Sequence, residues 1–201
     1  MATILTSLRN TVIAGFILTI VLFVVFVSIG ATSTENMMGF QQYLFRYLHV
    51  VSAIMWIGLL WYFNFVQIPS MPKIPDEQKP AIGKVIAPTA LFWFRWGAMA
   101  TLITGLGLAG ANGYLVDALL LGSQSGTPRN SVIGMGMWLA IIMWFNVWFV
   151  IWPNQKKALG IVQVEPDVKA KAARMAMLFS RTNTVLSIPM ILCMVGQSHM
   201  S

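Results

Sequence analysis

Apolar side chains occur in five long runs, and the shorter segments between them hold most of the charged residues. We expect one transmembrane helix in each run, over residues 11–31, 42–66, 89–111, 131–152 and 182–198. Because a helix needs about 20 residues to cross the hydrocarbon core, the last run, at about 17, is at the short end of the usable range. The pattern predicts an all-α polytopic membrane bundle, with the whole chain, 1–201, as one membrane domain.

The segments between the runs carry turn and surface signals. Prolines are frequent in 67–88 and another, Pro153, follows the fourth run, and we expect them to interrupt the helices because proline lacks a backbone N–H. A Gly/Ser-rich connection, 112–130, contains a short apolar piece. In residues 166–180 the apolar side chains share one side of a helix and the basic ones lie elsewhere, which predicts an amphipathic helix on the cytoplasmic surface of the membrane.

Composition agrees with a membrane location. Hydrophobic residues make up 57% of the chain and charged residues 9%, against about 25% charged in soluble proteins. All but two of the 13 lysines and arginines fall on one side of the predicted bundle, the exceptions being Arg46 and Arg129. By the positive-inside rule, the amino terminus is cytoplasmic and the carboxy terminus periplasmic. We therefore expect a multi-pass protein of a bacterial inner membrane, with the lipid bilayer and not nucleic acid as its surroundings.

The first run permits two interpretations. Arg9 precedes it, and Gly30 and Ala31 end it, as in a signal peptide. Its apolar stretch is longer than the core of a typical signal, which favours a retained first helix, with cleavage as the alternative.

The second run contains the candidate site. Arg46 and His49 lie three residues apart and so share a helix face, which continues to Trp56. The other histidine, His199, follows the last run, and the predicted topology places both histidines toward the periplasmic face of the membrane. Imidazoles are common axial ligands of haem, and an arginine suits a propionate. We therefore predict a haem b site with His49 and His199 as metal ligands and Arg46 and Trp56 beside the cofactor.

Each part of this site has an alternative. His49 also fits a hydrogen-bonded packing residue, and His199 a solvated tail. Met190 and Met194 are further candidates for an axial ligand. Small residues recur every fourth position at Gly97, Thr101, Gly105 and Ala109, which indicates either close packing of another helix or a surface behind a flat cofactor.

Other chemistry finds little support in the sequence. None of the five runs contains a carboxylate, so the usual proton relay or intramembrane cation site is not expected. The single cysteine, Cys193, allows neither a disulfide nor the CxxCH motif that attaches haem c covalently.

Four segments resemble a known family: YLHVVSAIMWIGLLWYF, LFWFRWGAMATLITG, IWPNQKKALGIV and SRTNTVLSIPMILCMVGQSHM. They are similar to the membrane domain of the bacterial membrane-anchored urate oxidases (urate hydroxylases). The H-x6-W-x-G pattern is also shared with copper-resistance membrane proteins and membrane protoporphyrinogen oxidases. The resemblance implies histidines at positions 49 and 199 and, by its name alone, an oxidoreductase that acts on urate.

The family's full-length members carry further spans and a carboxy-terminal cytochrome c domain, whereas this chain ends at Ser201. We therefore expect a membrane redox subunit that passes electrons to a separate c-type cytochrome, or a form without enzyme activity. The alternative is a non-catalytic accessory subunit that packs against other membrane subunits, an idea motivated by the small-residue stripe and the short last run.

Overall fold

The computed structural model describes residues 5–30 and 37–197, and every regular element within these ranges is a helix. The chain divides into two compact units between Tyr43 and Leu44, inside helix α3 (Met37–Trp61), where the sequence predicted one domain. Each unit is therefore described by itself.

The first unit consists of helix α2 (Leu8–Ser28) and the start of α3. Ser7 caps α2, because its hydroxyl oxygen accepts a hydrogen bond from the backbone N–H of Asn10 at 3.5 Å. All residues of α2 are described and none is buried, so α2 presents apolar side chains on every side. Such a surface suits contact with lipid.

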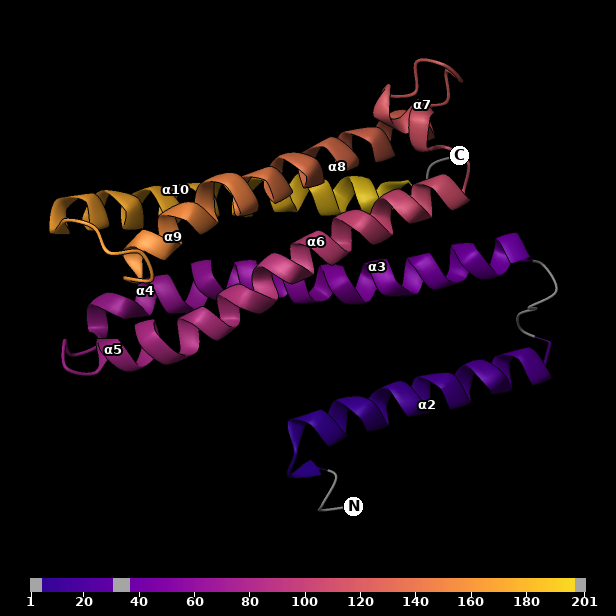
Figure 1. The fold of residues 1–201 in the computed structure, drawn as a ribbon. Helices are drawn as coiled ribbons and strands as arrows, with labels where there is room; N and C mark the ends of the chain where they lie inside the picture. The colour runs from indigo at the N-terminus through magenta and orange to yellow at the C-terminus, as the bar shows by residue number, and fades with distance from the viewer. Residues whose placement is uncertain (1–4, 31–36, 198–201) are drawn as a thin grey trace. The chain divides into compact units, whose positions relative to one another are not determined.

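The second unit contains the rest of α3 and all later elements (Figure 1). Helix α3 continues through η1 (Tyr62–Gln67), α4 (Ile68–Ser70) and η2 (Met71–Lys73). The next span joins α5 (Lys79–Ala81), η3 (Ile82–Ile86) and α6 (Ala87–Ala111). After the short α7 (Leu115–Leu119) come α8 (Pro128–Phe145), η4 (Asn146–Ile151), α9 (Trp152–Ala158) and α10 (Pro166–Gly196).

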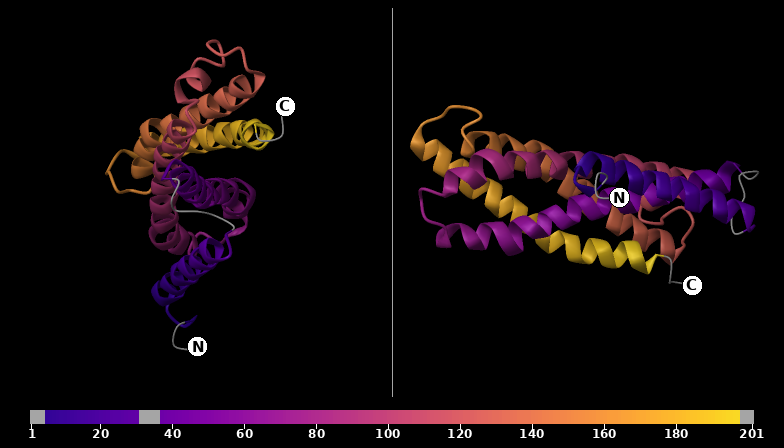
Figure 2. Two further views of the ribbon diagram at one scale, coloured as in Figure 1. Left: turned by 90° about the vertical axis from the view of Figure 1, so that its right-hand side faces the viewer. Right: turned by 90° about the horizontal axis from the view of Figure 1, so that it is seen from below.

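Within the described residues, five continuous helices are long and apolar enough to cross a membrane, which confirms the predicted all-α polytopic architecture. They are Leu8–Ser28, Met37–Lys73, Lys79–Ala111, Pro128–Ala158 and Pro166–Gly196. Four of these lie wholly or largely in the second unit and run alongside one another, and α7 lies at one end of them (Figure 2).

The prolines do not interrupt the helices as expected. The helices continue past Pro69, Pro88 and Pro153, and a π-helical segment (η1, η3 or η4) ends two residues before each of these prolines. A proline ring inside an α-helix clashes with the carbonyl four residues earlier. The wider π turn lies where that carbonyl must move aside, so each span accommodates its proline.

The expected division between a surface helix at 166–180 and a last span at 182–198 is also absent. Residues 166–196 form the single helix α10, which contains Pro189. Its buried positions recur every three or four residues and are mostly small or polar: Ala172, Ala176, Ser180, Asn183, Ser187 and Met190. This narrow stripe lets α10 approach α8, η4 and α9 closely.

The core of the second unit combines large apolar side chains with a polar cluster. Its fully buried members include Trp56, Leu60, Phe94, Met143 and Ile151. Within it, Asn183 donates to the Met143 carbonyl at 2.9 Å and accepts from the Asn146 amide at 2.8 Å. Trp61 and Asn64 donate to Ser187 and Ser180 at 3.0 and 2.8 Å. These hydrogen bonds join three helices where no water is at hand.

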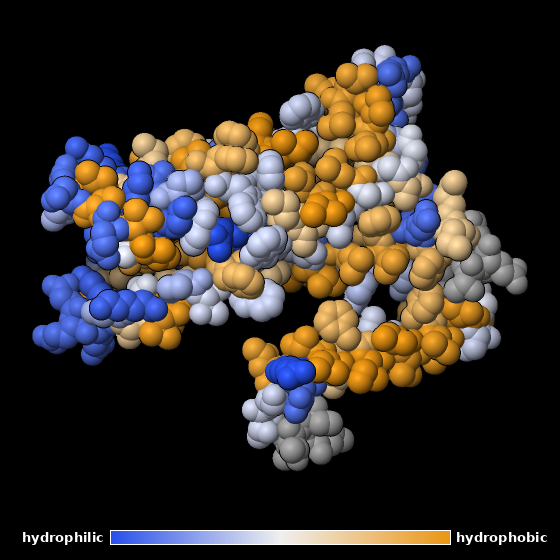
Figure 3. Space-filling view, in the orientation of Figure 1, coloured by the Kyte–Doolittle hydropathy of each residue, from blue (hydrophilic) through white to orange (hydrophobic). Residues whose placement is uncertain are grey.

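Hydrophilic residues gather at the ends of the second unit, and apolar residues cover most of its middle (Figure 3). The end that carries α5, α9 and the start of α10 is the more hydrophilic in this view. This distribution is typical of a membrane-spanning bundle.

Candidate functional site

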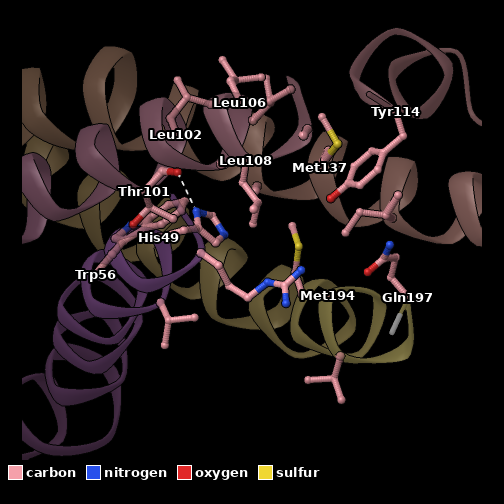
Figure 4. Close-up of a pocket in the computed structure, with 18 of the residues that line it drawn as sticks. His49, Trp56, Thr101, Leu102, Leu106, Leu108, Tyr114, Met137, Met194 and Gln197 are labelled. Atoms are coloured by element: carbon pink, nitrogen blue, oxygen red, sulfur yellow. Dashed lines mark hydrogen bonds between the residues drawn. The ribbon is translucent and has the colours of Figure 1, made fainter. Parts of the chain in front are cut away.

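A cavity of about 440 Å³ lies among α3, α6, α8 and α10 at the end of the second unit that carries α7 (Figure 4). Three of the four predicted site residues, Arg46, His49 and Trp56, line it together. The fourth, His199, lies outside the described residues. Arg46, His49 and Trp56 were predicted to share one face of a helix, and the fact that they line one cavity is consistent with that prediction.

The His49 ring is held by the backbone of α6. Its Nδ1 lies 3.0 Å from the carbonyl oxygen of Thr101 (Figure 4). A carbonyl can only accept, so Nδ1 carries the proton and donates it. The other ring nitrogen, Nε2, then keeps its lone pair and is free of a hydrogen bond to any other described residue. This is the tautomer that a metal-ligating imidazole needs.

The small-residue stripe on α6 makes room for this arrangement. A Cβ added at Gly105 would lie 2.8 Å from Cε1 of His49, and one at Gly97 would lie 3.3 Å from the backbone nitrogen of Trp56. The stripe therefore packs against α3, as the packing interpretation predicted. Its members Thr101, Gly105 and Ala109 also line the cavity.

Positive charge gathers where the cavity meets a second, more polar one of about 610 Å³. Four residues line both: Arg46, Tyr114, Arg129 and Gln197. Burial raises the pKa of the Tyr114 phenol, and the charges of Arg46 and Arg129 act in the opposite direction. Both guanidinium groups are therefore close enough to Tyr114 for their fields to act on it.

Arg129 and Tyr114 did not appear among the predicted site residues. The sequence carried one signal, because Arg129 is one of only two basic residues on the sparsely charged side of the bundle. Tyr114 had no signal of its own, since its position depends on how the connection 112–130 folds.

Asp117 determines the fold of that connection. Its carboxylate accepts hydrogen bonds from the backbone N–H groups of Gln124 (2.9 Å) and Ser125 (3.1 Å), from the Ser125 hydroxyl, and from the Asn130 amide (2.7 Å). These donors, the Ser125 hydroxyl first, lower the pKa of Asp117 to about 2. The carboxylate thus fixes the segment that leads to Arg129.

Helix α7 is in turn seated on α8. A Cβ added at Gly134 would overlap the Ala118 carbonyl oxygen, so only glycine permits this approach. The Trp138 indole N–H donates to the Leu119 carbonyl at 3.0 Å. The connection that lines the polar cavity is consequently held in two ways, by the hydrogen bonds of Asp117 and by the packing of α7 on α8.

Possible metal ligands in the cavity are few. Over residues 5–30 and 37–197, no group of three or more His, Cys, Asp or Glu side chains is placed to hold a metal ion. The cavity offers one imidazole, from His49, and the thioethers of Met137 and Met194. Such a donor set fits a cofactor that brings most of its own metal ligands and leaves one or two positions to the protein.

Fold and cavity together define a polytopic α-helical membrane protein whose described cavity lining includes an orientated imidazole and two arginines. Residues 109–201 match the family model described as Urate oxidase N-terminal. The match supports the resemblance seen in the sequence, and over these residues the chain is similar to urate oxidase membrane domains. Tyr114, Arg129 and Met194 fall inside the matched segment, whereas Arg46 and His49 precede it.

Two further comparisons found nothing: neither the curated proteins nor the solved structures include a match to this chain.

Proposed function

We propose that this chain is a membrane redox subunit that would hold haem b in the cavity, with His49 Nε2 as a ligand of its iron. The observation that carries the proposal is the hydrogen bond from His49 Nδ1 to the Thr101 carbonyl. Metal-ligating histidines commonly donate their second ring N–H in this way, which fixes the ring and increases the basicity of the ligating nitrogen.

The two arginines support the same cofactor. Haem b carries two propionate carboxylates, and the cavity has two cationic side chains, Arg46 and Arg129, at the boundary with the polar cavity. Guanidinium groups pair well with carboxylates because they present a planar fork of N–H donors. The rest of the lining is largely apolar, which suits a porphyrin ring.

Two residues are candidates for a second ligand from the protein. His199 is the one the sequence predicted, and it follows the last described turn closely. Met194, on α10, already lines the cavity. Methionine as the second ligand would raise the reduction potential relative to two histidines.

Each protein group has a definite task in this proposal. His49 would bind the haem iron, and the Thr101 carbonyl orients the His49 ring. Arg46 and Arg129 would neutralise the propionate carboxylates, and the apolar walls exclude water. Haem, when bound, supplies one-electron transfer. We propose a c-type cytochrome as the electron acceptor, and the CxxCH motif that it needs is not among these 201 residues. Urate is the substrate to assay first, because the matched family is named for its oxidation.

A reduced-minus-oxidised absorption spectrum of the purified, haem-supplemented chain tests the proposal. A haem b spectrum is expected, and His49→Ala should abolish it. Arg129→Gln should keep the bands but shift the midpoint potential, because it removes a charge near a propionate and leaves the ligand intact. Arg174→Gln, an exposed arginine on α10, is the control and should change neither. An unchanged spectrum in His49→Ala would refute His49 as a ligand, and no spectrum in the wild type would refute the cofactor.

The accessory-subunit alternative was suggested by two features. The small-residue stripe on α6 contacts α3 of the same chain at Gly97 and Gly105, and the last span is part of a 31-residue helix, so neither feature requires a partner subunit. Co-purification with other membrane subunits, without a haem spectrum, is the result that would bring this alternative back.

A further inference from the structure

Arg95 is a half-buried arginine on α6 that contacts two tryptophans of the neighbouring span. Its guanidinium carbon lies 3.3 Å from the centroid of the Trp152 ring and 5.8 Å from that of Trp148. Its Nε donates to the Leu91 carbonyl at 3.3 Å, one turn earlier on α6. Cation–π contact offsets part of the cost of removing this charge from water, but it does not neutralise the charge.

A second cation shares the same ring. Lys156 Nζ lies 5.7 Å from the centroid of Trp152. The charges of Arg95 and Lys156 therefore cannot be farther apart than their two distances to this centroid added together. Across the described ranges, the ion pairs are Lys79–Asp76 and Lys171–Asp167. Neither Arg95 nor Lys156 takes part in them. Two partly desolvated like charges repel each other, and an anion between or beside them would remove that cost.

Trp148 adds a donor without a partner. Its Nε1 is buried, and it makes no hydrogen bond within the part of the chain that the structure describes. An indole N–H can only donate. Arg95 thus lies against both tryptophan rings and Lys156 against one of them. Two positive charges beside this pair of rings, one of which has an unused N–H, are a combination suited to a phosphate group.

The depth of Arg95 and Trp152 in the membrane indicates whether the phosphate belongs to a lipid headgroup or is free in solution. About 20 residues of helix cross the hydrocarbon core. Counted back from Ala111, they reach the opposite boundary roughly one turn on the N-terminal side of Arg95. The hydrogen bond to Leu91 directs the guanidinium toward that level. Trp152 lies 24 residues after Pro128, where its own span begins, so it also lies near this boundary.

We propose that Arg95, Lys156, Trp148 and Trp152 form a binding site for the phosphate of an anionic phospholipid headgroup. The neighbouring large apolar side chains favour a lipid over free phosphate. Phe92, Trp96 and Phe149 are 47%, 49% and 58% exposed, and they offer a surface for the acyl chains. Basic pockets between spanning helices at the more positive membrane face commonly bind anionic lipid headgroups.

Lipid titration of the purified full-length chain in detergent tests this site, with the thermal unfolding temperature as the readout. The probes are short-chain phosphatidylglycerol, phosphatidylcholine of the same chain length, and inorganic phosphate. Only phosphatidylglycerol should raise the unfolding temperature in a saturable manner. Arg95→Gln should weaken its apparent affinity about tenfold, and Lys156→Gln about fivefold.

Arg174→Gln is the matched control, since Arg174 is exposed and basic but lies on α10; its affinity should equal that of the wild type. If Arg95→Gln does not fold, Lys156→Gln decides the question alone. An equal effect of phosphatidylcholine, an equal effect of inorganic phosphate, or an unchanged affinity in Lys156→Gln would each overturn the proposal.

Discussion

At the level of single residues, the orientation of the His49 ring depends on the backbone of α6. The Thr101 carbonyl accepts its Nδ1 proton, and the missing side chain at Gly105 leaves space for the ring. Both contributions come from positions that carry no reactive group of their own. The imidazole is therefore fixed before any ligand arrives, which is what a preorganised ligand requires.

Gly105→Ala should destabilise the protein by about 1–3 kcal/mol, because the new methyl group would overlap the imidazole of His49. Gly110→Ala on the same helix is the control. A Cβ there meets nothing within 4 Å, so the substitution should be neutral or stabilising by up to about 1 kcal/mol. Thermal unfolding in detergent measures both. In a His49→Ala background the penalty at Gly105 should disappear, and a penalty that persists would contradict the overlap.

Asn183→Ala tests the buried polar cluster. Asn183 is fully buried and bridges the Met143 carbonyl and the Asn146 amide. Its removal leaves the Asn146 amide without an acceptor, which should lower the free energy of unfolding by about 1–3 kcal/mol. Asn154→Ala serves as the control, because Asn154 bonds only to the Val150 carbonyl of its own helix. Equal losses in the two variants would mean that the link between helices adds nothing.

At the level of elements, the connection around α7 is held by a single carboxylate. Its low pKa means that the folded connection favours the charged form of Asp117. The stabilisation is present above the ordinary carboxyl pKa of 3.8 and is lost as the pH falls through about 2. No other described carboxylate lies within this connection, so its acid response belongs to Asp117.

We therefore expect the amides of Gln124 and Ser125 to lose protection against hydrogen exchange as the pH is lowered from about 4 to 2, after correction for the intrinsic rates. Asp117→Asn should show reduced protection that does not vary over this range. Exchange followed by mass spectrometry reports on this segment directly. Wild-type protection that stays constant down to pH 2 would show that Asp117 does not hold the connection.

The elements also show how far the sequence could predict the structure. Length and apolar content determine the number of spans, so that was predicted correctly, and Arg46, His49 and Trp56, placed on one helix face from their spacing, line one cavity. The continuity of the helices past Pro69, Pro88 and Pro153 was not, because proline rules are local and a π turn depends on the whole helix being held by its neighbours. Arg129 and Tyr114 were missed because long-range contacts of Asp117 place them.

At the level of the whole molecule, the distribution of basic residues predicts which end of the bundle faces the cytoplasm. In a Cys193→Ala background, a cysteine at Lys73 should react with a membrane-impermeant maleimide only after the membrane is permeabilised. A cysteine at Ser123 should react in intact cells from which the outer membrane has been removed. Both positions are exposed in the structure. The reverse pattern of labelling would invert the orientation, and with it the membrane face assigned to the cavity.

The three π segments have a consequence for how this bundle tolerates changes in length. Each residue of an α-helix advances the chain by about 100° around the helix axis, so one surplus residue would normally turn the whole remainder of a span away from its neighbours. A π turn absorbs that surplus locally. Segments η1, η3 and η4 therefore uncouple the two halves of their spans: the half near α7 can keep the cavity lining in register while the other half gains or loses a residue. A single-residue insertion or deletion during evolution is survivable at these three places, and elsewhere in the same spans it would rotate the cavity lining out of position.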